Sequence, residues 1–114
     1  MEDVVTIERI INKMREWVET NTPVPPSRWL DTAQRLNVLR SDLDDELYTL
    51  EHNLAVDRAR IVQNETAAKA NIFIEAKEEY MRSKKIRAKI KQLEEFIRIS
   101  KKQATLKDNQ WNDS

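Results

Sequence analysis

Residues 29–61 read WLDTAQRLNVLRSDLDDELYTLEHNLAVDRARI and contain neither glycine nor proline. Apolar side chains recur in this run at two heptad positions, which hold Trp29, Leu36, Leu43 and Leu50 in one case and Ala33, Leu47, Leu54 and Ile61 in the other. Arg40 interrupts the second of these positions, between Ala33 and Leu47. Such a seam is typical of a long helix that packs lengthwise against another helix.

Glycine is absent from all 114 residues, and no proline follows Pro26. Glycine supplies the positive-φ positions that tight turns and phosphate-binding loops use, so a chain without it is expected to consist almost entirely of helices. Charged residues make up 35% of the chain and aromatic residues 6%. The sequence therefore predicts one thin domain in which each helix buries a stripe.

The residues before the first seam predict a shorter helix. Apolar side chains recur three or four residues apart over 3–21, at Val4, Ile7, Ile11, Met14 and Val18. This spacing is typical of an amphipathic helix. The prolines of residues 23–26 end it, and Ser27 is the expected N-cap of the next helix. Trp17 and Trp29 flank this connection and are expected to form a small apolar cluster.

A second seam follows the first but does not share its register. One heptad position holds Ile72, Ile86, Leu93 and Ser100, with Glu79 interrupting it. The other holds Ala76, Ser83, Ile90, Ile97 and Ala104. From Leu50 to Ile86 is 36 residues, one more than five heptads. The helix therefore either breaks near residues 63–71 or absorbs a one-residue slip in phase.

The distribution of charge favours a break. Residues 1–66 carry a net charge of −5 and residues 67–114 a net charge of +5. Residues 41–57 contain acids and no Lys or Arg, whereas 80–91 contain bases and no acid. An antiparallel hairpin that turns near residue 68 would place these two blocks side by side, with Leu50 near Ile86. One continuous helix that pairs with a second copy would satisfy the same charges.

We therefore predict an all-α chain, a short N-terminal helix followed by a long antiparallel helical hairpin of the coiled-coil kind. The expected parts are the helix at 1–22, the Pro-rich connection at 23–26, the hairpin at 27–103 with its break near 63–71, and a polar tail at 104–114. The residues expected to hold the seam are Leu36, Leu43, Leu47, Leu50, Leu54, Ile86, Ile90, Leu93 and Ile97.

Residues that carry out catalysis are scarce. The chain has no cysteine, and its one histidine, His52, lies off the seam without a triad around it. Three pairs of acids have the i, i+3 spacing that a helical Mg²⁺ site would use, namely Asp42/Asp45, Glu16/Glu19 and Glu75/Glu78. The hairpin register keeps Asp42 and Asp45 far from Glu75 and Glu78. We expect no enzyme, no metal site and no cofactor.

Two features are candidates for binding. The first is a basic block of six residues, Arg82, Lys84, Lys85, Arg87, Lys89 and Lys91. These cations either pair with the acids of 41–57 or contact the phosphates of a nucleic acid or another acidic partner. The second is Trp111, which lies in the polar tail and is a candidate anchor for a partner protein.

Two stretches, VETNTPVPPSRWLDTAQRLNVL at 18–39 and EAKEEYMRSKKIRAKIKQLEEFIRISKK at 75–102, resemble small helical proteins of unassigned function from tailed bacteriophages. The resemblance is compositional and implies expression in a bacterial host. We expect a non-enzymatic interaction protein that self-associates and binds a protein partner, with an accessory nucleic-acid-binding role in phage replication or recombination as the alternative. The expected location is the host cytoplasm or the virion, with no membrane segment, because no apolar run reaches the about 20 residues that span a bilayer.

Overall fold

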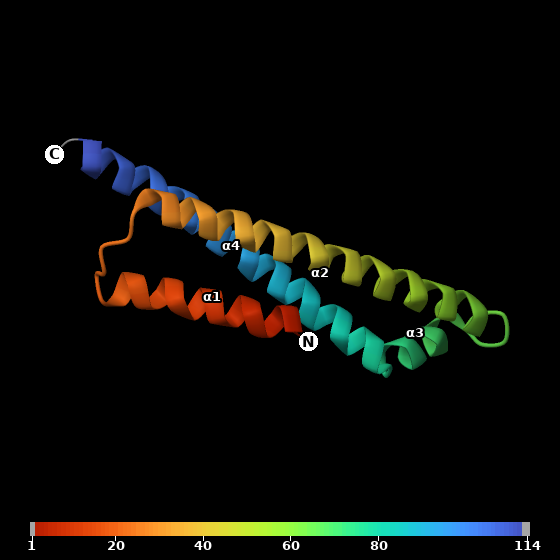
Figure 1. Cartoon of the computed structure of the whole chain (residues 1–114). Helices are drawn as coiled ribbons and strands as arrows, with labels where there is room; N and C mark the ends of the chain where they lie inside the picture. Colours follow the sequence, from red (N-terminus) through yellow and green to blue (C-terminus); the bar gives the residue numbers. More distant parts are fainter. Residues whose placement is uncertain (1, 113–114) are drawn as a thin grey trace. The chain divides into compact units, whose positions relative to one another are not determined.

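The structure is a computed structural model that describes residues 2–112 and the side chains of residues 4–106. This part of the chain contains four helices and no strand: α1 (Glu2–Glu19), α2 (Pro26–Ile61), α3 (Ala67–Glu75) and α4 (Glu78–Asn112) (Figure 1). The long helices α2 and α4 pack against each other in opposite directions. The predicted all-α hairpin is therefore confirmed, and the chain does not form one continuous helix.

The chain divides into two compact units, each of which is described by itself. The first consists of the described residues up to Ser41 together with those from Lys91 onward, so it holds α1 and the outer parts of α2 and α4. The second, Asp42–Ile90, holds the rest of α2, all of α3 and the beginning of α4.

Three helices form the core of the first unit. Ile7, Ile11 and Met14 of α1 are buried, as are Leu36 of α2 and Ser100 of α4. The Ser100 hydroxyl donates a hydrogen bond to Met14 Sδ at 3.8 Å, which gives this buried polar group a partner. Full burial of an aliphatic side chain stabilises a fold by about 1.5–3 kcal/mol. The stripe of α1 thus holds that helix against the other two.

The predicted tryptophan cluster is also present in the first unit. The rings of Trp17 and Trp29 meet edge to face, with their centroids 5.1 Å apart and their planes at 82°. Val24 is buried in the same connection. Edge-to-face contact is a favourable arrangement of two aromatic rings because the positive edge of one meets the negative face of the other.

Helix α1 ends without the glycine that usually occupies the left-handed position just after a helix. Asn21 has a φ of 52° and is the only residue with positive φ in the described chain. Its N–H bonds Val18 O at 3.2 Å, and the Thr22 N–H bonds Trp17 O at 3.1 Å. This pair of bonds is the Schellman motif that glycine usually closes, and asparagine is the common substitute.

The expected start of α2 needs a correction. The helix begins at Pro26, so Ser27 is its second residue and not its N-cap. Proline suits the first helical position because its φ is already helical and its missing N–H would have had no partner there. Pro25 O accepts from the N–H groups of Arg28 and Trp29.

The second unit contains the reversal of the chain (Figure 1). Helix α2 ends at Ile61, and Thr66 caps α3 by accepting a hydrogen bond from the Lys69 N–H at 3.2 Å. A further interruption at residues 76–77 separates α3 from α4. The structure therefore has two breaks, and the first falls at residues 62–66.

The extra break changes which residues of α3 are buried. Ile72 was expected in the seam with Ala76, but both are exposed, and Ala70 and Ile74 are buried instead. A helix that is separate from α4 need not keep the heptad phase of α4, so it packs on its own face. The assignment of Ile72 and Ala76 to the seam was therefore wrong.

Most of the remaining seam residues lie in the interior. Buried side chains are those of Leu36, Leu43, Leu54, Ile86, Ile90, Leu93 and Ile97, whereas Leu47 and Leu50 are half-buried. Helix α4 continues to Asn112, through residues that we assigned to a polar tail. The backbone of Trp111 is part of that helix, and its side chain lies outside the described residues.

Candidate functional site

The acidic and basic blocks meet through ion pairs in the second unit. Arg82 pairs with Glu46, and Arg87 pairs with Glu51, so each pair joins α4 to α2. All four side chains are at least partly exposed. Exposed ion pairs contribute only about 0–1 kcal/mol each, so their main effect is to favour this antiparallel pairing of the helices over others.

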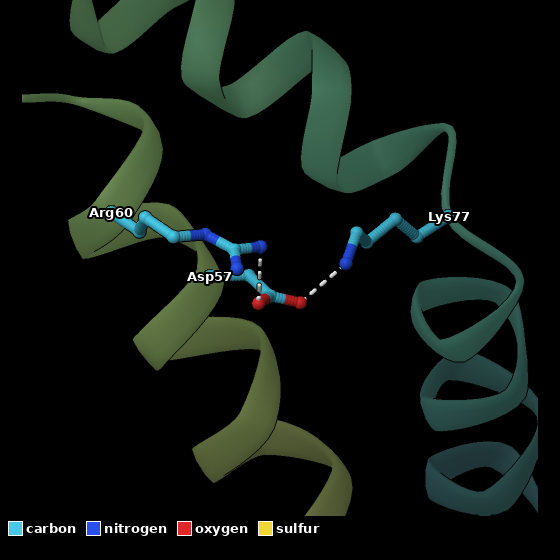
Figure 2. Close-up of polar contacts among 3 residues, drawn as sticks. All are labelled: Asp57, Arg60 and Lys77. Atoms are coloured by element: carbon cyan, nitrogen blue, oxygen red, sulfur yellow. Dashed lines mark hydrogen bonds and ion pairs between the residues drawn. The ribbon is translucent and has the colours of Figure 1, made fainter. Parts of the chain in front are cut away.

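A third contact joins α2 to the second break and was not predicted. Asp57 lies between two cations, Arg60 one turn later on α2 and Lys77 in the segment between α3 and α4 (Figure 2). The Arg60 guanidinium is 3.1 Å from the Asp57 carboxylate, and Lys77 Nζ donates a hydrogen bond to the other carboxylate oxygen. Lys77 lies before the basic block, so the charge pattern alone did not single it out.

The Asp57 carboxylate is held in its charged form. The hydrogen bond from Lys77 has the largest influence and lowers the pKa of Asp57 below its ordinary value of 3.8. Desolvation opposes this shift, and the charges of Lys77 and then of Arg60 lower the pKa further. A carboxyl whose pKa is lower in the folded state stabilises the fold above its unfolded pKa. This contribution is lost as the pH falls from the unfolded pKa through the folded one.

We therefore expect Asp57→Asn to reduce the loss of stability on acidification. Urea unfolding at about pH 5 and about pH 3 brackets the ordinary pKa of an aspartate, so the difference in midpoint should be smaller in the variant than in the parent. Asp31→Asn is the matched control, because Asp31 is exposed and has no ion pair among the described residues. An equal change in both variants would contradict the assignment.

The basic block as a whole is divided between two environments. Arg82 and Arg87 are paired with acids, and Lys89 is half-buried. Lys85 and Lys91 are exposed and have no carboxylate partner in the described part of the chain. Arg82 and Arg87 thus form the predicted pairs with the acids, and Lys85 and Lys91 face solvent.

The candidate acids do not assemble into a metal site among the side chains of residues 4–106. No group of three or more His, Cys, Asp or Glu side chains is placed there to hold a metal ion. His52, Asp42 and Asp45 are exposed on α2.

Three large apolar residues near the reversal of the chain, Val62, Ile72 and Phe73, are exposed, and we call these three residues the turn-end patch. Their exposed fractions are 42%, 66% and 53%. Phe73 also lines an open hollow of about 550 Å³ together with Ile61 and Lys77. Large apolar side chains left exposed in one region of a chain are candidates for contact with another molecule.

The sequence contained a signal for this patch that we did not use. Ile72, Phe73 and Ile74 are consecutive, and successive residues of a helix point about 100° apart, so a single stripe cannot bury all three. Ile74 is the one that is buried. The other two are therefore left on the surface.

No helix of the described chain is sufficiently long and apolar to pass through a bilayer. No protein-family model, curated protein or solved structure matches this chain.

Proposed function

We propose that this chain is a non-enzymatic helical interaction protein that self-associates through the turn-end patch and presents its helices to a protein partner. The observation that carries the proposal is the exposure of Ile72 and Phe73, which are consecutive on α3, and of Val62 just after α2. Full burial of an isoleucine or phenylalanine contributes about 1.5–3 kcal/mol, and the exposed part of each side chain remains available to an interface.

The charges around the patch favour a second copy of the chain as its occupant. Lys69 and Glu65 form an ion pair at 3.6 Å, and Arg60 and Glu75 are exposed; all four lie close to the patch residues in the sequence. A surface that carries both signs can pair with itself across a two-fold axis, because each copy offers a partner for every charge of the other. The net charge of zero adds no overall repulsion between copies.

The bacteriophage setting and a location in the host cytoplasm or the virion belong to this proposal and rest on the resemblance of residues 18–39 and 75–102. Trp111 remains the candidate anchor for the protein partner. An accessory nucleic-acid-binding role is the second candidate, because Lys85 and Lys91 are exposed and have no carboxylate partner among the described residues. The pairing of Arg82 and Arg87 within the chain favours the first proposal.

Replacing both Ile72 and Phe73 with serine should weaken self-association. We expect the dissociation constant, measured by sedimentation over a range of protein concentrations, to rise at least about tenfold, since about 1.4 kcal/mol of lost interface energy corresponds to that factor. The matched control is Val38→Ser with Val56→Ser, which also replaces two exposed apolar residues but on α2. Far-UV circular dichroism checks that both double variants stay helical.

Two results would overturn the proposal. One is a parent protein that sediments as a monomer at every concentration. The other is an equal rise of the dissociation constant in the patch variant and in the α2 control, because apolar surface in general, and not the turn-end patch, would then drive association.

A further inference from the structure

A hollow of about 440 Å³ opens in the second unit where α2, α3 and α4 meet. It is separate from the turn-end patch, since none of the three patch residues lines it. Ligand sites in proteins typically enclose about 300–1,000 Å³, so the hollow has the size of a small-molecule site.

The hollow follows from the helix spacing and from two small side chains. Its residues on α4 lie at 80, 83, 84 and 87, and those on α2 at 51, 54, 55 and 58. Both sets have the three- and four-residue steps that line one face of a helix. Ala55 and Ser83 are among them and fill little of the space between the two helices.

The charge of the lining is positive. Three cations, Arg58, Lys84 and Arg87, face one carboxylate, Glu51, and that carboxylate is already paired with Arg87. Arg58 and Lys84 have no carboxylate partner among the described residues. Two positive charges, one on each wall, are therefore left for a ligand.

The base of the hollow is mostly apolar, with Ser83 as the buried polar residue of the lining. Leu54 and Ile74 line it and are buried. The Tyr80 ring lines it as well, is half-buried, and has Lys84 Nζ at 5.2 Å from its centroid. The lining thus combines buried apolar side chains with cations that are exposed to solvent.

We propose that this hollow binds a small organic phosphate, with the phosphate on Arg58 and Lys84 and the apolar or aromatic body of the ligand against Leu54 and Ile74. Charge-assisted hydrogen bonds to a phosphate are strong, and both basic side chains supply donors for them. Inorganic phosphate would leave the apolar base in water, whereas a neutral apolar molecule would desolvate the cations without pairing them. A phosphate that carries an apolar group satisfies both parts of the lining.

The test is calorimetric titration of the whole chain at low salt with AMP and with phenyl phosphate, and with adenosine and inorganic phosphate as controls. At least one of the two organic phosphates should bind about tenfold or more tightly than either control. Arg58→Ala and Lys84→Ala should each weaken that binding about tenfold, whereas Lys85→Ala, which removes a neighbouring exposed cation outside the hollow, should change it less than about twofold.

A second pair of variants tests the space without changing charge. Ala55→Leu should fill the hollow and abolish binding, and Ala59→Leu, one turn further along α2 and outside the lining, should leave it intact. The proposal is overturned if neither organic phosphate binds, if inorganic phosphate binds as tightly as they do, or if Lys85→Ala is as harmful as Lys84→Ala. Unchanged binding in Ala55→Leu would also overturn it.

Discussion

Replacing Ile86 with alanine should lower the free energy of unfolding by about 2–5 kcal/mol, the range for aliphatic side chains lost from a packed core. Ile86 lies in the second unit on α4 and has no exposed surface. The loss combines the transfer free energy of the removed methyl and methylene groups with the cost of the cavity they leave. In a chain whose helices bury only narrow stripes, few other apolar contacts compensate, and small domains have about 5–15 kcal/mol of stability in all.

The measurement is urea unfolding followed by far-UV circular dichroism, at one fixed protein concentration so that self-association does not shift the midpoint. Met81→Ala is the matched control, because Met81 lies on the same helix and is 57% exposed. That variant should change the free energy of unfolding by no more than about 0.5 kcal/mol. Equal losses in the two variants would mean that Ile86 does not occupy a packed interior.

The hairpin could be predicted because two independent patterns in the sequence agree. The heptads that contain Leu50 and Ile86 differ by one residue in phase, and the midpoint between the acidic and basic blocks falls near residue 68. A change of phase requires a local irregularity in the helix, and the charge blocks favour a reversal over a slip. Thr66 was a further signal that we did not use, since threonine is a preferred N-cap and it precedes the alanines that begin α3.

The second break could not be predicted in the same way. Ala76 and Lys77 separate α3 from α4, and both residue types have high helix propensity. This break depends on tertiary packing, because Ile74 just before it is buried in the second unit and Lys77 within it bonds Asp57 of α2. Neither contact is visible in the local sequence, and each involves residues that are distant along the chain.

The binding surfaces could be predicted only in part, because they too depend on contacts between residues that are distant along the chain. The basic block was recognised from composition, but which of its cations are paired depends on the angular position of each residue around α4. Lys84 lines the hollow and Arg82 pairs with Glu46, although the two are separated by one residue. Arg58 was not considered, because it lies outside the basic block in sequence and reaches the same hollow only once α2 and α4 are paired.

Replacing Trp29 with alanine should have a still larger effect, about 3–5 kcal/mol, because an aromatic ring leaves the largest cavity. Trp29 lies near the start of α2, is 2% exposed, and holds Trp17 of α1 in an edge-to-face contact. Its removal should therefore loosen α1 as well as the start of α2. Leu30→Ala is the matched control, since Leu30 is the next residue and is 47% exposed, and it should cost far less.

A third variant separates the ring of Trp29 from its polar atom. Trp29 Nε1 is buried and has no hydrogen-bond partner among the described residues, and a buried donor without a partner costs about 1–3 kcal/mol. Trp29→Phe keeps a ring against Trp17 and removes that donor, so the gain should offset much of the lost packing. In urea unfolding followed by circular dichroism, Trp29→Phe should remain much closer to the parent than Trp29→Ala. Equal destabilisation of the two variants would contradict the view that Trp29 Nε1 is an unpaired donor whose removal offsets the lost packing.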